Sequence, residues 1–230
     1  MKQRIVVLDI DGTLTDSIAL HQHAFGAAMA ALGLPSLNTD WSSYPSHTDI
    51  GIYQHALQEN GRPLDAHAQH VFEADVEHRF MTLLANTPVH EIRGATDFLA
   101  ALDRTDWAVV FATGGIRGVS GKKLDALGVA YDASMLVTSS EYAARDELVA
   151  AAIMRAKQKY ALATPLAVVS VGDGRWDLEV AATLGVDFLG VGAGTSAHWL
   201  RAQGATVIPD LTGGLEALSS FLDGPLHLHA

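Results

Sequence analysis

Near its start the chain reads Ile5-Val6-Val7-Leu8-Asp9-Ile10-Asp11-Gly12-Thr13, an apolar run that ends in two aspartates one residue apart. Side chains at positions i and i+2 of a strand lie on the same face, so we expect Asp9 and Asp11 to converge while Ile10 packs on the opposite face. Two like charges a few ångströms apart repel by about 4 kcal/mol at an effective dielectric of about 20. The pair therefore calls for a cation, a shared proton or both. Taken alone, Asp-Gly-Thr is equally typical of a plain turn.

The composition limits the classes of protein to which the chain can belong. With 230 residues, 49% of them hydrophobic and 18% charged, it is long enough for one substantial domain or for a core with a smaller inserted module. The formal net charge of −11 disfavours nucleic acid and anionic membranes as partners, because phosphate groups are bound by clustered lysine and arginine. An anionic substrate would need positive charge concentrated at its site, which a divalent metal supplies.

The chain contains no cysteine, which excludes disulfides, thiolate metal sites and a cysteine nucleophile. The apolar run near the N-terminus stops at Asp9 and is too short for the core of a signal peptide or for a membrane span. We therefore expect a soluble cytoplasmic protein, either a monomer or a small homo-oligomer.

Short apolar runs rich in β-branched residues recur along the chain. They cover residues 5–8, 107–112, 135–137, 166–171, 188–191 and 206–208. These runs do not alternate with polar residues, which is typical of parallel strands covered by helices on both faces. Helix-like segments separate most of them, so the sequence predicts an α/β fold with a doubly wound, mostly parallel sheet.

One segment interrupts this rhythm. From residue 17 to residue 88 the sequence predicts only helices, at 18–32, 50–59 and 66–84, with glycine-proline breakers between them. We therefore expect an inserted all-helical domain at 17–88 and an α/β domain made of 1–16 and 89–230.

Polar residues follow the second and fourth long apolar runs, where the carboxyl ends of parallel strands place ligand sites. Thr113-Gly114-Gly115 offers a hydroxyl and unhindered backbone N–H groups for an oxyanion, although Thr113 could also be a simple helix N-cap. In Gly172-Asp173-Gly174-Arg175-Trp176-Asp177 the two acids are one helical turn apart. Such hard oxygen ligands suit Mg²⁺, although a turn and a solvated first-turn acid would leave the same pattern.

Together, the three motifs at Asp9–Thr13, Thr113–Gly115 and Gly172–Asp177 resemble those of the haloacid dehalogenase superfamily of phosphohydrolases. The resemblance covers nearly the whole chain. It implies a Rossmann-like core, and the helical insert resembles the superfamily's class 1 cap. It also implies that Asp9 is a nucleophile that forms an aspartyl-phosphate. Asp11 would then hold a proton, pass it to the leaving oxygen and later activate water.

The resemblance further implies a Mg²⁺ ion held by Asp9, the backbone carbonyl of Asp11 and Asp173. Thr113 and the Gly114 amide would bind phosphoryl oxygens, and Asp177 would orient the metal's surroundings.

The sequence departs from the superfamily at the third motif, where a lysine is expected. Arg145 is the nearest cation at a helix start, and its planar guanidinium can bridge a phosphate and Asp9. Lys122 and Lys123 are alternatives, but their place in the middle of a helix favours a solvated face. Arg117, one turn after Thr113, could also meet an anion, although surface exposure is the simpler interpretation.

The insert should determine specificity because it closes over the strand ends. His47 and Thr48, in a polar loop before a helix, are candidates to face the substrate, although Thr48 or Asp49 could simply cap that helix. His67, His70, Glu73 and Glu77 share helical spacing, but we expect a solvated face there and not a metal site.

The leading functional hypothesis is a Mg²⁺-dependent phosphatase of a small phosphorylated metabolite. A phosphomutase of the same build would use the same residues, and a catalytically silent binding module on this fold is a third possibility. A dehalogenase is disfavoured because the resembling motif of those enzymes lacks the second aspartate, Asp11. The identity of the substrate does not follow from the sequence.

Overall fold

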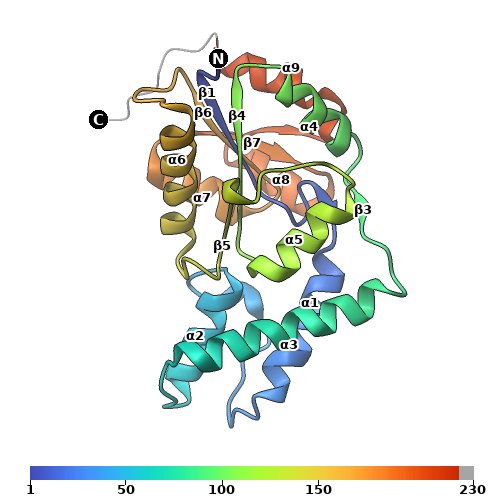
Figure 1. The fold of residues 1–230 in the computed structure, drawn as a ribbon, viewed down its shortest axis with the longest axis vertical. Helices are drawn as coiled ribbons and strands as arrows, with labels where there is room; N and C mark the ends of the chain where they lie inside the picture. The colour runs from blue at the N-terminus through green and yellow to red at the C-terminus, as the bar shows by residue number, and fades with distance from the viewer. Residues whose placement is uncertain (223–230) are drawn as a thin grey trace.

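The central sheet contains six parallel strands within residues 1–222, the part of the chain that the computed structural model describes. They are β1 (Arg4–Leu8), β4 (Trp107–Thr113), β5 (Leu136–Thr138), β6 (Val168–Gly172), β7 (Asp187–Val191) and β8 (Thr206–Ile208). Their order is β5-β4-β1-β6-β7-β8, so β1 lies between β4 and β6 (Figure 1). Each of the six apolar runs forms a strand whose ends differ from the predicted ones by two residues or fewer, which confirms the predicted parallel sheet.

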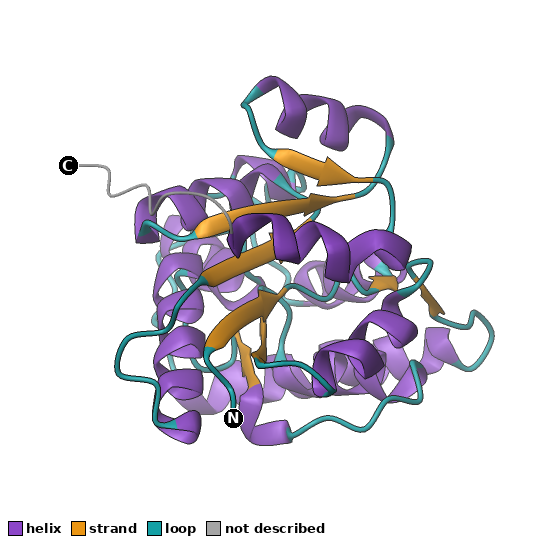
Figure 2. Cartoon of the chain, turned by 90° about the horizontal axis from the view of Figure 1, so that it is seen from above, coloured by secondary structure: helices purple, strands orange, loops and turns teal. Residues whose placement is uncertain are grey.

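Helices cover both faces of this sheet, as Figure 2 shows. The helices of the α/β part are α4 (Ala95–Asp103), α5 (Arg117–Ala126), α6 (Arg145–Tyr160), α7 (Arg175–Leu184), α8 (Gly194–Ala202) and α9 (Gly214–Ser219), with short 3₁₀ turns η2 (Ala133–Met135), η3 (Leu211–Gly213) and η4 (Ser220–Leu222). Val6 and Leu8 pack in a cluster with α4 and α9, whereas Ile5 and Val7 pack in a cluster with α6. Because both faces of β1 are buried, every residue of its core is apolar.

The segment between β1 and β4 forms a helical cap beside the strand ends (Figure 1). It consists of α1 (Ile18–Ala31), η1 (Trp41–Ser43), α2 (Asp49–Glu59) and α3 (Ala66–Leu84). The cap has a hydrophobic cluster of its own, which is rich in aromatic side chains such as Phe25, Tyr53 and Phe72. Ile116 and Val119 of the α5 region join this cluster and so attach the cap to the α/β part.

A small second sheet lies where the chain enters and leaves the cap. In it β2 (Thr15–Asp16) pairs antiparallel with β3 (His90–Glu91). The sequence did not predict these strands because each is only two residues long and depends on a partner distant in sequence. The pairing of β2 with β3 joins the chain segments that enter and leave the cap, and so holds the cap helices near the end of β1.

No helix within residues 1–222 combines the length and the apolar character needed to cross a lipid bilayer.

Candidate active site

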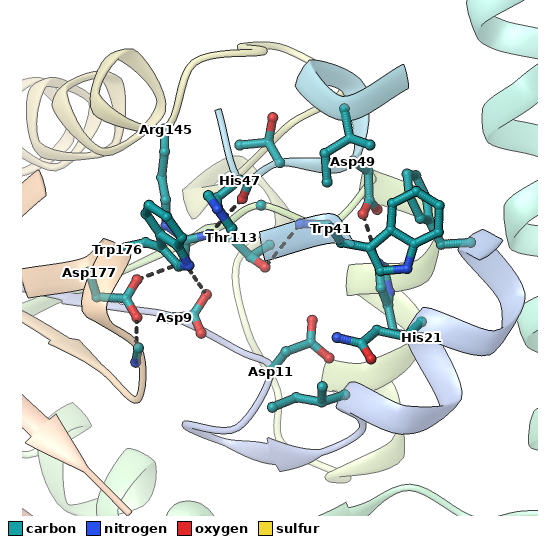
Figure 3. A pocket seen from close by; sticks show the side chains of 18 of the residues that line it. Asp9, Asp11, His21, Trp41, His47, Asp49, Thr113, Arg145, Trp176 and Asp177 are labelled. Atoms are coloured by element: carbon teal, nitrogen blue, oxygen red, sulfur yellow. Dashed lines mark hydrogen bonds and ion pairs between the residues drawn. The ribbon is translucent and has the colours of Figure 1, made fainter. Parts of the chain in front are cut away.

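A cavity of about 340 Å³ lies between the carboxyl ends of the strands and the cap (Figure 3). Asp9 and Asp11 follow β1, Thr113 ends β4, Asp173 follows β6, and Arg145 begins α6. All five line the cavity, together with Gly114 and Asp177. The structure thus brings the catalytic, phosphate-binding and metal residues predicted from the sequence to one place. This happens because parallel strands end at the same edge of a sheet.

Asp9 is 7% exposed and lies against a cluster of other charges. Its Oδ1 accepts a hydrogen bond from Arg145 Nη2 at 3.3 Å, and its Oδ2 accepts one from Thr13 Oγ1 at 3.4 Å. Burial raises the pKa of Asp9 well above its ordinary value, and the nearby carboxylates of Asp177 and Asp173 raise it further, against the opposing effect of Arg145. The carboxylate therefore lacks sufficient positive charge around it.

Three carboxylates are placed to share a metal ion. Oxygen atoms of Asp9, Asp173 and Asp177 all lie within 4.8 Å of one another. Burial and then the charge of Asp177 raise the pKa of Asp173 to about 7. A single arginine does not balance this negative charge, and hard oxygen donors suit a divalent cation, so the residues present fit a metal such as Mg²⁺.

Gly12 provides the space that one of these carboxylates occupies. Its backbone is left-handed, with φ of 76°, and a Cβ atom on it would overlap the side chain of Asp173. Both observations require glycine at this position.

Asp11 is held apart from the metal cluster by contacts of its own. Its Oδ2 accepts a hydrogen bond from Lys123 Nζ and its Oδ1 accepts one from Ser17 Oγ, each at 2.5 Å. Burial acts to raise the pKa of Asp11, but the charge of Lys123 and the hydrogen bonds from Lys123 and Ser17 outweigh it, and the pKa is lowered to about 2. The family resemblance implied that Asp11 holds a proton. The arrangement in this structure instead favours its ionised form, because a buried lysine is paired with it.

Lys123 is the largest departure from the sequence predictions. It is fully buried, and its Nζ also donates to His21 Nδ1 at 2.8 Å. Since an ammonium group only donates, His21 carries its proton on Nε2, which lies 2.9 Å from Asp49 Oδ1. The prediction of a solvated face was wrong for Lys123 because α5 turns this face toward the cap. Lys122 is half-buried and is not among the residues that line the cavity.

Arg145 takes the position expected of the positive group. Its Nη2 donates to Asp177 Oδ1 at 2.6 Å as well as to Asp9, and its Nη1 donates to the backbone oxygen of His47 at 3.1 Å (Figure 3). Burial acts to lower the pKa of Arg145, but the two carboxylates raise it above its ordinary value. A Cβ on Gly114 would overlap both the His47 oxygen and the guanidinium, so glycine is needed there for this approach.

Thr113 does not cap a helix. It is 1% exposed, its Oγ1 accepts a hydrogen bond from the Gly115 amide at 3.3 Å, and α5 begins later, with Ile116 as its N-cap. Its hydroxyl hydrogen remains available to a ligand oxygen in the cavity.

The two cap candidates differ in role. Thr48 is the N-cap of α2: its Oγ1 accepts from the Gly51 amide and donates to the backbone oxygen of Ala143, which commits the hydroxyl to the fold. His47 lines the cavity with a left-handed backbone, φ 43°, and its ring stacks on Trp176. Burial lowers the pKa of His47 to about 4.

Two other charged groups lie elsewhere. Arg117 donates to the backbone oxygen of Leu136 at 2.6 Å and pairs with Glu141 at 2.9 Å, and it is not among the residues that line the cavity. On α3, Glu73 accepts a hydrogen bond from Ser140. Within residues 1–222 no cluster of three or more metal-ligating side chains includes α3.

A comparison of the sequence with protein-family models identifies the family of this chain. Residues 3–185 match the family model of haloacid dehalogenase-like hydrolases, which is more than half of the chain. The chain belongs to this family. A search of curated proteins found no match for it.

Solved structures with the same fold include several members of this hydrolase family and related phosphoryl-group enzymes. A hydrolase from Pseudomonas syringae is 20% identical, with a TM-score of 0.66 over 95% of this chain and 99% of that one. A putative β-phosphoglucomutase from Bacteroides vulgatus is 17% identical, with a TM-score of 0.67 over 97% of this chain and 91% of that one. CbbY from Rhodobacter sphaeroides, solved in complex with phosphate, is 18% identical, with a TM-score of 0.65 over 90% of this chain and 94% of that one. At these identities the likeness establishes the fold.

Sequence reasoning missed the residues that complete the cavity of this haloacid dehalogenase-like hydrolase. His21 and Asp49 connect Lys123 to the cap, and Trp41 and Trp176 form part of the cavity wall. One signal was available: His21 lies one helical turn after Ser17, the N-cap of the helix that follows the first motif. The other contacts join residues too distant in sequence for any local pattern.

Proposed function

We propose that this hydrolase is a Mg²⁺-dependent phosphomonoester hydrolase that acts on a small phosphorylated metabolite through an aspartyl-phosphate intermediate. One observation carries the proposal. The buried carboxylate of Asp9 opens into a cavity with an arginine 3.3 Å away, and the Thr113 hydroxyl and the Asp173 carboxylate line the same cavity. Phosphoryl transfer requires a nucleophile, hydrogen-bond donors for the anionic phosphoryl group, and an acid cluster that can bind a cation.

In the proposed reaction Asp9 attacks phosphorus, the phosphorus–oxygen bond to the alcohol breaks, and the electron pair leaves with the alcohol oxygen. Asp11 in its protonated form passes its proton to that oxygen, which leaves Asp11 ionised beside Lys123. Water then attacks the phosphorus of the aspartyl-phosphate while Asp11 takes a proton from the water. The bond between phosphorus and Asp9 breaks, which frees the Asp9 carboxylate and releases phosphate. The contact from Lys123 favours ionised Asp11 and so favours this second half.

Arg145 would act on the phosphoryl oxygens and keep Asp9 in position. Its Nη2 holds Asp9 and Asp177 together, so the nucleophile cannot turn away from the cavity. Thr113 and the Gly114 amide would donate to the remaining phosphoryl oxygens.

Asp9, Asp173 and the backbone carbonyl of Asp11 would hold the Mg²⁺, and Asp177 would orient its surroundings. When bound, the ion would neutralise charge between an anionic nucleophile and an anionic phosphate.

We also propose the domain division expected from the sequence, with the cap at 17–88 and the α/β domain at 1–16 and 89–230. Two features support it: the cap helices have their own hydrophobic cluster, and β2 pairs with β3 where the chain crosses. Residues 223–230 lie outside the described part of the chain.

The test is hydrolysis of p-nitrophenyl phosphate and of a panel of sugar, nucleotide and acid phosphates, with and without Mg²⁺. We expect Asp9→Asn to abolish turnover, because an amide is a poor nucleophile, while Asp103→Asn, an exposed residue of α4, leaves it unchanged. Acid-quenched wild-type enzyme should carry one phosphoryl group on the peptide that contains Asp9. Turnover that survives Asp9→Asn or that needs no divalent metal would overturn the mechanism.

A further inference from the structure

One part of the cavity wall is built from uncharged side chains of the cap. The cap contributes Ile18, Gln22, Phe25, Trp41, Ser42 and Ile52 to it. None of these side chains is charged. Four are apolar, and Ile18 remains 38% exposed although it is one of the large hydrophobic residues. An apolar side chain left open at a ligand cavity is available to a ligand of similar character.

The apolar part of this wall is firmly supported. Trp41 meets the ring of Phe25 edge-on, with 5.3 Å between ring centroids, and Phe25 meets Phe72 in the same way at 5.9 Å. Trp41 also stacks on Tyr44. Because Phe25, which is only 2% exposed, and Tyr44 hold the Trp41 ring in place, Trp41 presents a fixed apolar surface to the cavity. The Gln22 amide lines the same cavity, and the Ser42 hydroxyl already donates to Asp40.

Positive charge in the cavity is confined to one end. Among the described residues that line it, Arg145 is the only lysine or arginine, and it is already paired with Asp9 and Asp177. His47 is uncharged at neutral pH because burial lowers its pKa to about 4. The nearby Arg175 lies over the Trp176 ring, outside the lining residues, and pairs with Glu179.

Negative charge, by contrast, is abundant. Five carboxylates line the cavity, and they are Asp9, Asp11, Asp49, Asp173 and Asp177. One phosphoryl group can be held at the end where Arg145, Thr113 and a metal are placed. A second anionic group, reaching toward the cap, would meet no cation there and would be repelled by the acids.

We propose that this cavity accepts phosphomonoesters in which the phosphoryl group is the only charged group and the alcohol part is an uncharged apolar ring, seated against Trp41 and Ile18. The inference rests on the proposed phosphatase function and makes its substrate class specific. Gln22 would hydrogen-bond neutral polar groups on the ring.

This substrate class also separates the phosphatase from the phosphomutase. A mutase that returns the phosphoryl group of Asp9 to a second hydroxyl of a phosphorylated substrate passes through a bisphosphate. The cavity would then have to hold one phosphate at the cap wall, where the lining residues offer no cation.

A matched pair of substrates tests the charge rule: 4-carbamoylphenyl phosphate and 4-carboxyphenyl phosphate. The two rings have nearly the same shape and differ by one negative charge. We expect kcat/KM to be at least about tenfold higher for the carbamoyl compound, with the difference mostly in KM. Glucose 1,6-bisphosphate should likewise be a poorer substrate than glucose 6-phosphate, and glucose 6-phosphate should not be converted into glucose 1-phosphate.

Two variants test the wall itself. Gln22→Lys places a cation at the wall and should bring the two phenyl phosphates to within about threefold of each other, whereas His23→Lys, the next residue on α1, lies outside the cavity and should not. Trp41→Ala should raise KM for both phenyl phosphates about tenfold with little change in kcat. Trp199→Ala, a tryptophan of α8 outside the cavity, is its control.

The outcomes for the inference and for the proposed function are distinguishable. If monoesters are hydrolysed but the carboxy compound or the bisphosphate is preferred, the substrate class is wrong and the phosphatase function stands. If no monoester is hydrolysed, the function fails. Calorimetry on Asp9→Asn with the two phenyl phosphates measures binding without turnover, and equal affinity for both would overturn the inference.

Discussion

Arg145 shows how one side chain can set the geometry of a whole site. Its guanidinium reaches Asp9, Asp177 and the backbone oxygen of His47 at once, and so joins the strand ends to the cap. A lysine presents a single ammonium group and cannot make these three contacts in one plane. We propose that Arg145 replaces the expected lysine, and its contact to His47 gives it the additional task of holding that loop.

We predict that Arg145→Ala lowers kcat by about a hundredfold or more, by analogy with the loss of one oxyanion donor. Arg145→Lys should recover part of kcat because the charge is kept, but not the affinity, because the contact to His47 is lost. Steady-state kinetics on both variants checks this. Arg155, on the same helix, contacts Leu136 and Glu141 instead, so Arg155→Ala is the matched control. Equal activity of Arg145→Ala and Arg155→Ala would contradict the assignment.

At the scale of the element, α5 explains the largest error of the sequence predictions. Lys122 and Lys123 are neighbours on this helix, yet one is half-buried and the other is fully buried. One residue step turns the side chain by about 100° around a helix, so neighbours face different surroundings. The face that carries Lys123 also carries Val119 and packs against the cap, where Phe80 lies below the ammonium group.

We predict that Lys123→Met lowers the free energy of unfolding by about 3 kcal/mol at pH 7.5, because it leaves the Asp11 carboxylate without its buried partner. In the wild type, Asp11 has a pKa of about 2, below its ordinary value, so the stability it contributes is present at neutral pH and is lost only as the pH falls toward 2. In the variant the opposing charge of Lys123 is gone and only the hydrogen bond from Ser17 remains, so we expect burial to raise the pKa of Asp11. Proton uptake by Asp11 should then relieve the loss of stability as the pH falls below neutrality.

Urea unfolding at pH 7.5 and at pH 5 measures this effect. The difference in free energy of unfolding between wild type and Lys123→Met should be smaller at pH 5 than at pH 7.5. Lys122→Met should have nearly the same free energy of unfolding as wild type at either pH. A gap that is independent of pH would show that Lys123 stabilises the fold by packing and not through Asp11.

At the scale of the whole molecule, the fold concentrates negative charge where it closes its cap. The metal-free protein places Asp9, Asp173 and Asp177 together, and the pKa of Asp173 is raised to about 7. A carboxyl whose folded pKa is raised contributes stability below its ordinary pKa, and that contribution is lost as the pH rises through the folded value. The metal-free protein should therefore lose stability between about pH 4 and pH 7.

We predict that Asp173→Asn raises the Tm of the metal-free protein at pH 8, where wild-type Asp173 is charged, but not at pH 5. Each kcal/mol corresponds to about 2–4 °C for a chain of this size. Mg²⁺ should raise the Tm of the wild type at pH 8 and leave the Tm of the variant unchanged, because a ligand stabilises only the state it binds. Thermal unfolding in EDTA and in Mg²⁺ measures both effects, with Asp103→Asn as control. A lower Tm for Asp173→Asn in EDTA would contradict the account.

The six strands, the three cap helices and the placement of Asp9, Thr113 and Asp173 at one edge were all predictable from local sequence. Buried parallel strands must be apolar on both faces, and that requirement leaves continuous runs that can be read without a structure. Once the strands are parallel, the residues that follow them must lie near one another.

The pairing of Lys123 with Asp11 and the apolar cap wall at Trp41 depend on the tertiary structure alone. The lysine and the aspartate are 112 residues apart, and they meet because α5 packs against the sheet while the cap covers the same face of α5. Side-chain burial and the electrostatic surroundings of a carboxylate are properties of the packed molecule, and they leave no periodic pattern in the chain. For this reason the sequence could indicate which residues meet at the strand ends, whereas the charge state of Asp11 and the shape of the cavity were decided by packing.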